Sequence, residues 1–254
     1  MSTATEGGHY YEALTGLPKY TVIGKNGKER ATTLRDARTL NLVPSVTTIS
    51  KMMDKPGLNN WREKQILLAA LTLPRIEGET DDAFADRVLA DAQAQAKQAR
   101  DNGTAVHGAI ELYCQGKAWD AKYDAHVAAV SKTLSELGIA HADMRPEKSF
   151  AHALRYGGKV DLHTTNVVVD FKTKDRIEDG KKYAYDEHCI QLAAYRFGFE
   201  LPLNAPCYNL FIGVQDAKVV VHEWSQQDLL WGQSVFFGLL DVWKRVNRFG
   251  EYSE

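Results

Sequence analysis

The sequence predicts a mixed α/β domain of the α+β kind, with a largely helical N-terminal half and a central β-sheet in the C-terminal half. From residue 58 to about residue 115 the chain is rich in Ala, Leu, Gln, Lys and Arg, and its apolar residues recur every three or four positions. After residue 147, β-branched and aromatic stretches alternate with helical ones. A chain of 254 residues fits one large domain or two small ones, and we expect a single domain over residues 1–254.

The N-terminal half divides into short elements followed by helices. "KYTVIGKNGKER" predicts a strand, an Asn-Gly turn and a returning strand, and "PSVTTISKMM" starts at a proline boundary and runs into a helix. Pro74 divides the helical stretch of residues 58–100 in two. "DNGT" is a turn signal, so Thr104 is expected to cap a new helix. A further helix is expected from Tyr123 to Leu137, where Gly138 ends it.

The C-terminal half reads as hairpin, helix, hairpin and helix. "KSFAHALRYGGKVDLH" and "NVVVDFKTK" have the composition of strands, and "YDEHCIQLAAYRFGFE" that of a helix. "CYNLFIGV" and "KVVVHEW" predict a second hairpin before a long amphipathic helix. This order predicts a sheet flanked by helices.

Composition limits the classes of function. The net charge of −2 provides no global basic field for nucleic acid, although a local groove could still be basic. The first residues, "MSTATEGGHYYE", lack an apolar signal segment, and no apolar run is long enough for a membrane, so we expect a cytoplasmic protein without a membrane partner. Three distant cysteines, Cys114, Cys189 and Cys207, indicate reduced thiols and are too few for an iron–sulfur cluster with four thiolates.

The stretch "GGKVDLHTTNVVVDFKTK" places charge where a hairpin would otherwise be apolar. Side chains alternate along a strand, so Asp170 and Lys172 share one face. If the hairpin turns at Thr165-Asn166, Asp161 lies opposite Asp170. By the same alternation, the side chains of the two neighbours of Asp161, Val160 and Leu162, point to the other face.

Two carboxylates in directly paired positions, with Cβ atoms about 4.5–5.5 Å apart, repel each other unless one is protonated or a cation lies between them. Mg²⁺ or Mn²⁺ is the economical explanation, because both favour oxygen ligands. Lys172 could then orient or activate a metal-bound water, or stabilise charge on a phosphate. From the hairpin alone, a solvent-facing Lys–Asp pair explains the pattern equally well.

Further motifs surround the hairpin in a fixed order. Gly103 and His107 lie four positions apart in a predicted helix, as do Gln191 and Tyr195 in a later one. The order is G-x-x-x-H, an isolated Glu147, G-x-x-D, D-x-K and Q-x-x-x-Y. From residue 104 to residue 195 this order resembles the RecB-like branch of the PD-(D/E)XK nuclease superfamily.

The similarity extends towards the N-terminus. "PSVTTI", followed by Leu58 and Trp61, resembles the opening of the phage exonucleases and of the mitochondrial genome-maintenance exonuclease in this superfamily. The resemblance implies a nuclease core with a mixed central β-sheet flanked by helices, in which residues 104–224 form the catalytic core. The long helical stretch before His107, residues 58–100, suggests a helical insertion or arch over the site.

The resemblance also implies roles for individual residues. The implied metal ligands are His107, Asp161, Asp170 and the backbone carbonyl of Phe171. The implied catalytic residues are Lys172, Asp161, Asp170, Gln191, Tyr195 and Glu147, where Lys172 is the catalytic lysine and Glu147 is only a loose match to an earlier acidic position. Position 170 is Asp where many relatives have Glu, but the motif accepts either.

The function expected from the resemblance is that of a metal-dependent DNA exonuclease that uses Mg²⁺ or Mn²⁺ and has no iron–sulfur cluster. The arch would favour single-stranded ends, because a single strand can thread where a duplex cannot. The alternatives are a duplex-end recombination exonuclease of the phage alkaline type and a non-catalytic DNA-binding module on the same fold. Expected partners are DNA and a recombination or single-strand-binding protein, in the host cytoplasm if a phage encodes the chain. The loop "DGKKYAYDEH" suits either phosphate contact and base stacking or a solvated loop.

Overall fold

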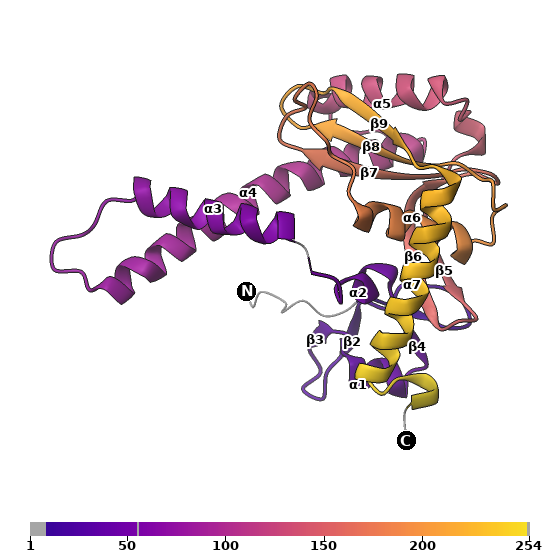
Figure 1. The fold of residues 1–254 in the computed structure, drawn as a ribbon, viewed down its shortest axis with the longest axis horizontal. Helices are drawn as coiled ribbons and strands as arrows, with labels where there is room; N and C mark the ends of the chain where they lie inside the picture. The colour runs from indigo at the N-terminus through magenta and orange to yellow at the C-terminus, as the bar shows by residue number, and fades with distance from the viewer. Residues whose placement is uncertain (1–8, 55, 253–254) are drawn as a thin grey trace.

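A five-stranded mixed sheet forms the centre of the protein (Figure 1). The computed structural model describes residues 9–54 and 56–252, apart from the side chains of Pro56, Leu58 and Tyr252. The strands, in their order across the sheet, are β5 (Arg145–His152), β6 (Tyr156–His163), β7 (Val168–Lys174), β8 (Cys207–Gly213) and β9 (Val219–Glu223). The pair β7–β8 is parallel and the other neighbours are antiparallel, which confirms the predicted fold class.

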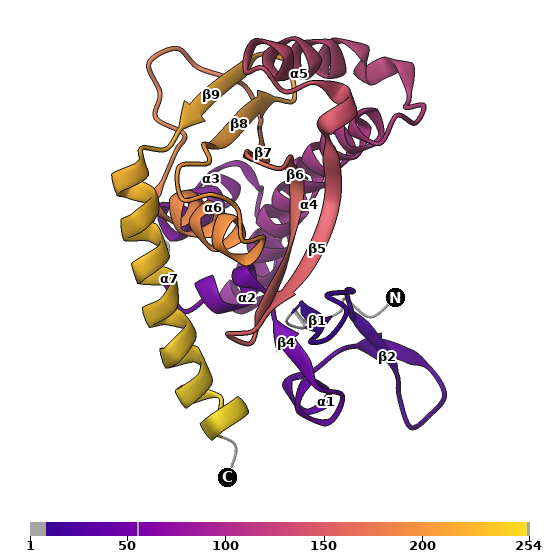
Figure 2. The ribbon, with the colours of Figure 1, turned by 90° about the vertical axis from the view of Figure 1, so that its right-hand side faces the viewer.

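Helices cover both faces of this sheet, and each face has its own apolar core. One face packs against α4 (Asp81–Cys114) and α5 (Asp124–Glu136), and the other against α6 (Asp186–Gly198) and α7 (Gln226–Val246). Figure 1 shows α5 above the sheet and α6 below it, and Figure 2 shows α7 along the side of the molecule. None of the described helices combines the length and the apolar character needed to cross a membrane.

The N-terminal region adds short elements, which lie below the sheet in the view of Figure 1. They are β1 (Tyr10–Glu12), β2 (Thr21–Ile23), β3 (Glu29–Ala31), α1 (Leu34–Thr39), β4 (Leu42–Pro44) and α2 (Val46–Ser50). The Asn-Gly hairpin appears as β2–β3, and Ser45 caps α2 by accepting a hydrogen bond from the Thr48 N–H at 2.9 Å. The remaining short helices are η1 (Ala121–Tyr123), η2 (His141–Asp143) and η3 (Gly250–Tyr252).

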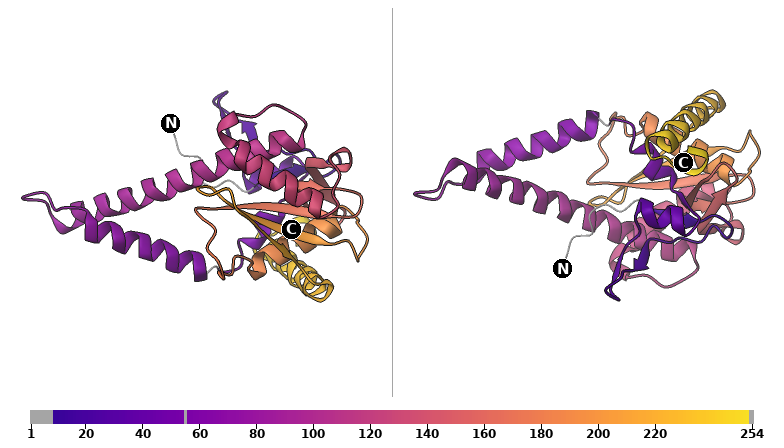
Figure 3. Two further views of the ribbon diagram at one scale, coloured as in Figure 1. Left: turned by 90° about the horizontal axis from the view of Figure 1, so that it is seen from above. Right: turned by 90° about the horizontal axis from the view of Figure 1, so that it is seen from below.

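A helical hairpin projects from this body (Figures 1 and 3). It consists of α3 (Pro56–Thr72) and residues 81–100 of α4, with Pro74 in the connection. A small apolar cluster joins the two arms; it contains Ala69, Val88 and Ala92, with Ile66, Leu73 and Phe84 beside them. The guanidinium of Arg87 donates to both carboxylate oxygens of Glu79, at 2.6 and 2.9 Å, and so ties the connection to α4.

The helix α4 runs without a break through "DNGT", so the prediction of a new helix capped by Thr104 is wrong. The Thr104 hydroxyl donates to the Arg100 carbonyl at 2.9 Å, a contact made inside a helix. A Cβ on Gly103 would lie 2.5 Å from the Thr173 hydroxyl oxygen. The glycine therefore serves the close approach of α4 to β7, and not a turn.

Candidate active site

Strand β6 changes its orientation at Asp161. Val160 packs into the core beside α6 and α7, whereas Leu162 packs into the core beside α4 and α5. The expectation that both side chains point to the same face is therefore wrong, because the alternation of the strand is interrupted between them.

The cause of this interruption is a break in the pairing of β5 with β6. The ladder pairs Pro146 with Leu162 and Lys148 with Val160, but no pair forms at the position between them, where Glu147 faces Asp161. Glu147 has a φ of 54°, in the left-handed region that non-glycine residues rarely adopt. Irregularities of this kind in a sheet re-aim a side chain and are frequent beside functional sites.

The pairing of β6 with β7 ends at the same point. Leu162 pairs with Val169, and one further step in that register brings Asp161 opposite Asp170, as the sequence predicts. No backbone pair forms there. Instead, the Asp161 carboxylate accepts a hydrogen bond from the backbone N–H of Phe171 at 2.7 Å. A side-chain oxygen thus replaces the backbone carbonyl that a neighbouring strand would provide.

His107 reaches this cluster from α4. Its Nε2 lies 3.3 Å from an oxygen of Asp161. Burial is the largest influence on the pKa of His107 and lowers it, but the hydrogen bond and charge of Asp161, with the charge of Asp170, leave that pKa raised. For Asp161 the directions are reversed. Burial raises its pKa, but its contacts with His107 and the charge of Lys172 leave that pKa lowered.

Asp170 is the most deeply buried carboxylate of the cluster, with 2% of its surface exposed. Lys172 Nζ lies 2.7 and 2.6 Å from its two oxygens, and the Asn209 amide donates to one of them at 2.8 Å. Asn209 in turn accepts the Trp224 indole N–H at 2.8 Å. Burial raises the pKa of Asp170 to about 6; the charge of Lys172 opposes this rise and the charge of Asp161 adds to it.

Helix α6 closes the other side of the cluster. Lys172 Nζ also donates to Gln191 Oε1 at 3.3 Å, and Gln191 Nε2 donates to the Tyr195 hydroxyl at 3.0 Å. Sequence reasoning missed Glu187. Burial is the largest influence on the pKa of Lys172 and lowers it, but the charges of Asp170 and Asp161, with a smaller contribution from Glu187, leave that pKa raised. The signal that could have found Glu187 is its position four residues before Gln191, on the same face of α6.

Gly158, the glycine of the G-x-x-D motif, lies beneath Tyr195. A Cβ at this position would lie 2.7 Å from Tyr195 Cε1 and 3.0 Å from Phe150 Cε1. Two rigid rings occupy that space, so glycine is required for Tyr195 to lie against β6.

The cluster thus brings together most of the residues singled out in the sequence, which are His107, Asp161, Asp170, Phe171, Lys172, Gln191 and Tyr195. Glu147 has a different partner, because its carboxylate forms an ion pair with Lys159 of β6. It adjoins Asp161 through the strand register and not through a hydrogen bond.

The chemistry of the donors fits a hard divalent cation. Two carboxylates and a neighbouring backbone carbonyl are oxygen ligands that suit Mg²⁺ or Mn²⁺, and the imidazole adds one nitrogen donor. In the structure the protein's own donors hold both carboxylates, Asp170 through Lys172 and Asn209, and Asp161 through His107 and Phe171. Within residues 9–54 and 56–252, no three His, Cys, Asp or Glu side chains are gathered as a metal site, so metal ligation here is a proposal.

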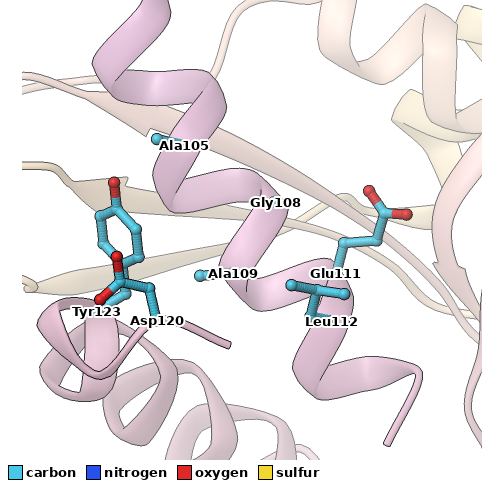
Figure 4. Close-up of a pocket in the computed structure, with 7 residues that line it drawn as sticks. All are labelled: Ala105, Gly108, Ala109, Glu111, Leu112, Asp120 and Tyr123. Carbon is cyan, nitrogen blue, oxygen red and sulfur yellow. The ribbon is translucent and has the colours of Figure 1, made fainter. Parts of the chain in front are cut away.

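A separate pocket of about 410 Å³ lies between α4 and η1 (Figure 4). Its lining residues are Ala105, Gly108, Ala109, Glu111, Leu112, Asp120 and Tyr123. Figure 4 shows Ala105 and Ala109 facing Tyr123. The lining contains two acidic side chains and no basic one, which does not suit a polyanion, and it includes none of the clustered residues.

Fold and site together describe an α/β protein with an aspartate–lysine–histidine cluster at a break in its sheet. No known protein family and no curated protein matches the sequence. Among solved structures, a "putative exonuclease" from Eubacterium rectale aligns with a TM-score of 0.42 and 12% identity, over 58% of this chain and 68% of that one. A protein named SSO0001 aligns with a TM-score of 0.27 and 12% identity, over 72% of this chain and 87% of that one. Both TM-scores are too low to define a family for the chain.

Proposed function

We propose that this protein is a metal-dependent deoxyribonuclease of the PD-(D/E)XK class that hydrolyses phosphodiester bonds. The observation that carries the proposal is the convergence of Asp161, Asp170 and Lys172 with His107 of α4 and Gln191 of α6, at the point where both ladders of β6 are interrupted. A surface hairpin with a solvent-facing Lys–Asp pair would not bury Asp170 to 2% exposure.

In the proposed mechanism, His107, Asp161, Asp170 and the Phe171 carbonyl would hold Mg²⁺ or Mn²⁺, which would activate water as the nucleophile and neutralise charge on the phosphate. Lys172 donates from its ammonium group to the scissile phosphate as negative charge develops there. Gln191 accepts from Lys172 and donates to Tyr195, so it fixes the direction of the ammonium group. Glu147 has an indirect role, because its ion pair with Lys159 stabilises the irregular strand opposite Asp161.

We further propose that the substrate is a single-stranded DNA end. The helical hairpin supports this, because its second arm and His107 belong to the same helix, α4 (Figure 3). A projecting arm beside the cluster would admit a single strand more readily than a duplex. A recombination or single-strand-binding protein is the kind of partner that would deliver such ends.

The first test is cleavage of single-stranded oligonucleotides, labelled at the 5′ or the 3′ end in turn, in Mg²⁺ or Mn²⁺. We expect stepwise shortening from one end, and a decrease on the order of 10²–10³-fold in Lys172→Ala. Lys132→Ala, which removes an exposed lysine on α5, is the matched control and should cleave normally. Full activity in Lys172→Ala would refute the mechanism, and tight DNA binding without cleavage would support the non-catalytic alternative.

The second test concerns the helical hairpin. Both arms are shortened by about two turns, roughly seven residues each, so that the helix phase is kept. We expect cleavage of single-stranded ends to decrease relative to cleavage of blunt duplex ends, because the hairpin excludes duplex. Equal digestion of both substrates before and after shortening would argue against an arch, while a preference of the unaltered protein for duplex ends would favour the recombination exonuclease. Closed circular DNA serves as the control for endonuclease activity.

A further inference from the structure

Arg196 of α6 is a buried cation without a counter-charge. Only 1% of its surface is exposed. Its Nη1 donates to three neutral acceptors, which are the carbonyls of Leu203 (2.6 Å) and Ala205 (3.4 Å) and Oε1 of Gln226 (2.7 Å). Among the described residues no carboxylate pairs with the guanidinium, although an unpaired charge is costly to bury.

The second guanidinium nitrogen has no partner in the part of the chain that the structure describes. Nη2 of Arg196 is buried without an acceptor, and Oε1 of Gln233, from α7, is buried without a donor. Both residues line one pocket of about 240 Å³. The other lining residues are His152, Phe197, Glu200, Leu201 and Leu203. Two residues from different helices, each with a buried polar atom that lacks a partner, therefore line the same opening.

We propose that this pocket binds a small oxyanion, either phosphate or carboxylate, through Arg196 Nη2 and the Gln233 amide. A guanidinium is the preferred protein group for such anions, because its planar donors match their oxygens. The pocket is smaller than the roughly 300–1,000 Å³ typical of sites for larger ligands, and it holds several times the roughly 30 Å³ that one water occupies. A protonated phosphate can also donate to Gln233 Oε1.

Two residues at the pocket have defined effects on an anion. The exposed Glu200 places a like charge at the pocket, which weakens anion binding. His152 Nδ1 accepts the Leu154 N–H at 3.1 Å, so the neutral ring carries its proton on Nε2 and remains a donor. The C-terminal end of α6 and the carbonyls around Nη1 offset part of the guanidinium charge, but none of them occupies Nη2.

This site is distinct from the candidate active site. Gln191 and Tyr195 lie on the face of α6 that meets Lys172, whereas Arg196 follows Tyr195 by one position and meets the loop before β8 and the start of α7. The proposal therefore does not depend on nuclease activity.

The test is calorimetric titration of the full chain in EDTA with inorganic phosphate or with acetate, against chloride of equal ionic strength. We expect one binding site for phosphate, acetate or both, and the two titrations show which oxyanion it accepts. Gln233→Leu should weaken binding about tenfold by removing a hydrogen-bonding partner of the anion. Glu200→Gln should tighten it by about two- to threefold through the loss of a like charge.

Two controls separate this pocket from other anion sites. Gln227→Leu, an exposed glutamine on the same helix as Gln233, should bind normally, and so should Lys172→Ala. Arg196→Gln should abolish binding, but Nη1 also holds the neighbouring loop, so the Gln233 and Glu200 variants decide the matter if Arg196→Gln does not fold. The proposal is overturned if neither anion binds at millimolar concentrations, if Gln233→Leu and Glu200→Gln bind like the unaltered protein, or if Lys172→Ala alone abolishes binding.

Discussion

Asp170 determines the charge balance of the candidate active site. It lies between the like charge of Asp161 and the opposite charge of Lys172, and burial raises its pKa to about 6. The opposite charges of the two aspartates and of Lys172 and His107 hold the cluster together. Loss of any one of these side chains would leave a buried charge without its partner. The same residue contacts therefore serve the fold and, in the proposed function, the chemistry.

Far from the site, Asp36 provides a residue-scale prediction about pH. Its carboxylate accepts from Arg30 at 2.6 and 2.8 Å and closes a capping box with Thr33 at the start of α1. The hydrogen bonds of Arg30, followed by those of Thr33, hold its pKa well below the ordinary value of 3.8. A lowered folded-state pKa means stability that is present above pH 3.8 and is lost as the pH falls towards the folded value.

We therefore expect Asp36→Asn to lower the free energy of unfolding by about 1 kcal/mol at pH 7. The difference from the unaltered protein should shrink as the pH falls below 3.8. Urea unfolding at a series of pH values measures both, with Asp241→Asn, an exposed acid on α7, as the control. A difference that is constant with pH would mean that the charge of Asp36 contributes nothing.

At the scale of elements, α4 contains two glycines with opposite expected behaviour. A Cβ on Gly108 meets no atom within 4 Å, whereas one on Gly103 would lie 2.5 Å from the Thr173 hydroxyl oxygen of β7. Alanine favours a helix interior over glycine by about 1 kcal/mol. Gly108→Ala should therefore stabilise the protein by up to about 1 kcal/mol, while Gly103→Ala should destabilise it, as measured by thermal unfolding. Equal stabilisation by both would show that Thr173 moves aside without cost.

Regular patterns in the sequence predict elements well, and irregular backbone is where prediction fails. Alternation along β7 correctly places Asp170 and Lys172 on the face of α6, opposite Phe171. No residue pattern marks the positive φ of Glu147, and this break in pairing moves Leu162 to the other face of the sheet. A glycine required for a turn and a glycine required for close packing look the same in sequence, so "DNGT" predicts a turn where the structure has a continuous helix.

The candidate site follows the same division. The spacing of His107, Gln191 and Tyr195 on their helices and the hairpin register predict which side chains meet. The ion pair that draws Glu147 to Lys159 arises only once β5 and β6 are paired. Tertiary contacts of this kind carry no local signal, because the partners are brought together by the sheet and not by their spacing.

At the scale of the whole molecule, the three cysteines are divided between the two apolar cores, one on each face of the sheet. Cys114 lies in the core between the sheet and α4, while Cys189 and Cys207 lie in the core beside α6 and α7. All three are buried and free, and burial raises the pKa of each thiol to about 12. A buried thiol that remains protonated reacts slowly, so its labelling reports the opening of the layer that contains it.

We expect no thiol of the native protein to react with Ellman's reagent at pH 8 within minutes, and all three to react at one urea midpoint. The reason is that the sheet is shared by both cores, so neither core can lose its packing without exposing the other face of the same strands. Labelling at increasing urea concentrations, with each cysteine quantified by mass spectrometry, gives the three midpoints separately, and circular dichroism of the same samples gives the global transition as the control. If Cys114 reacts at a lower urea concentration than Cys189 and Cys207, the layer of α4 and α5 opens independently, and the chain would be two cooperative units instead of the single domain that its sequence predicts.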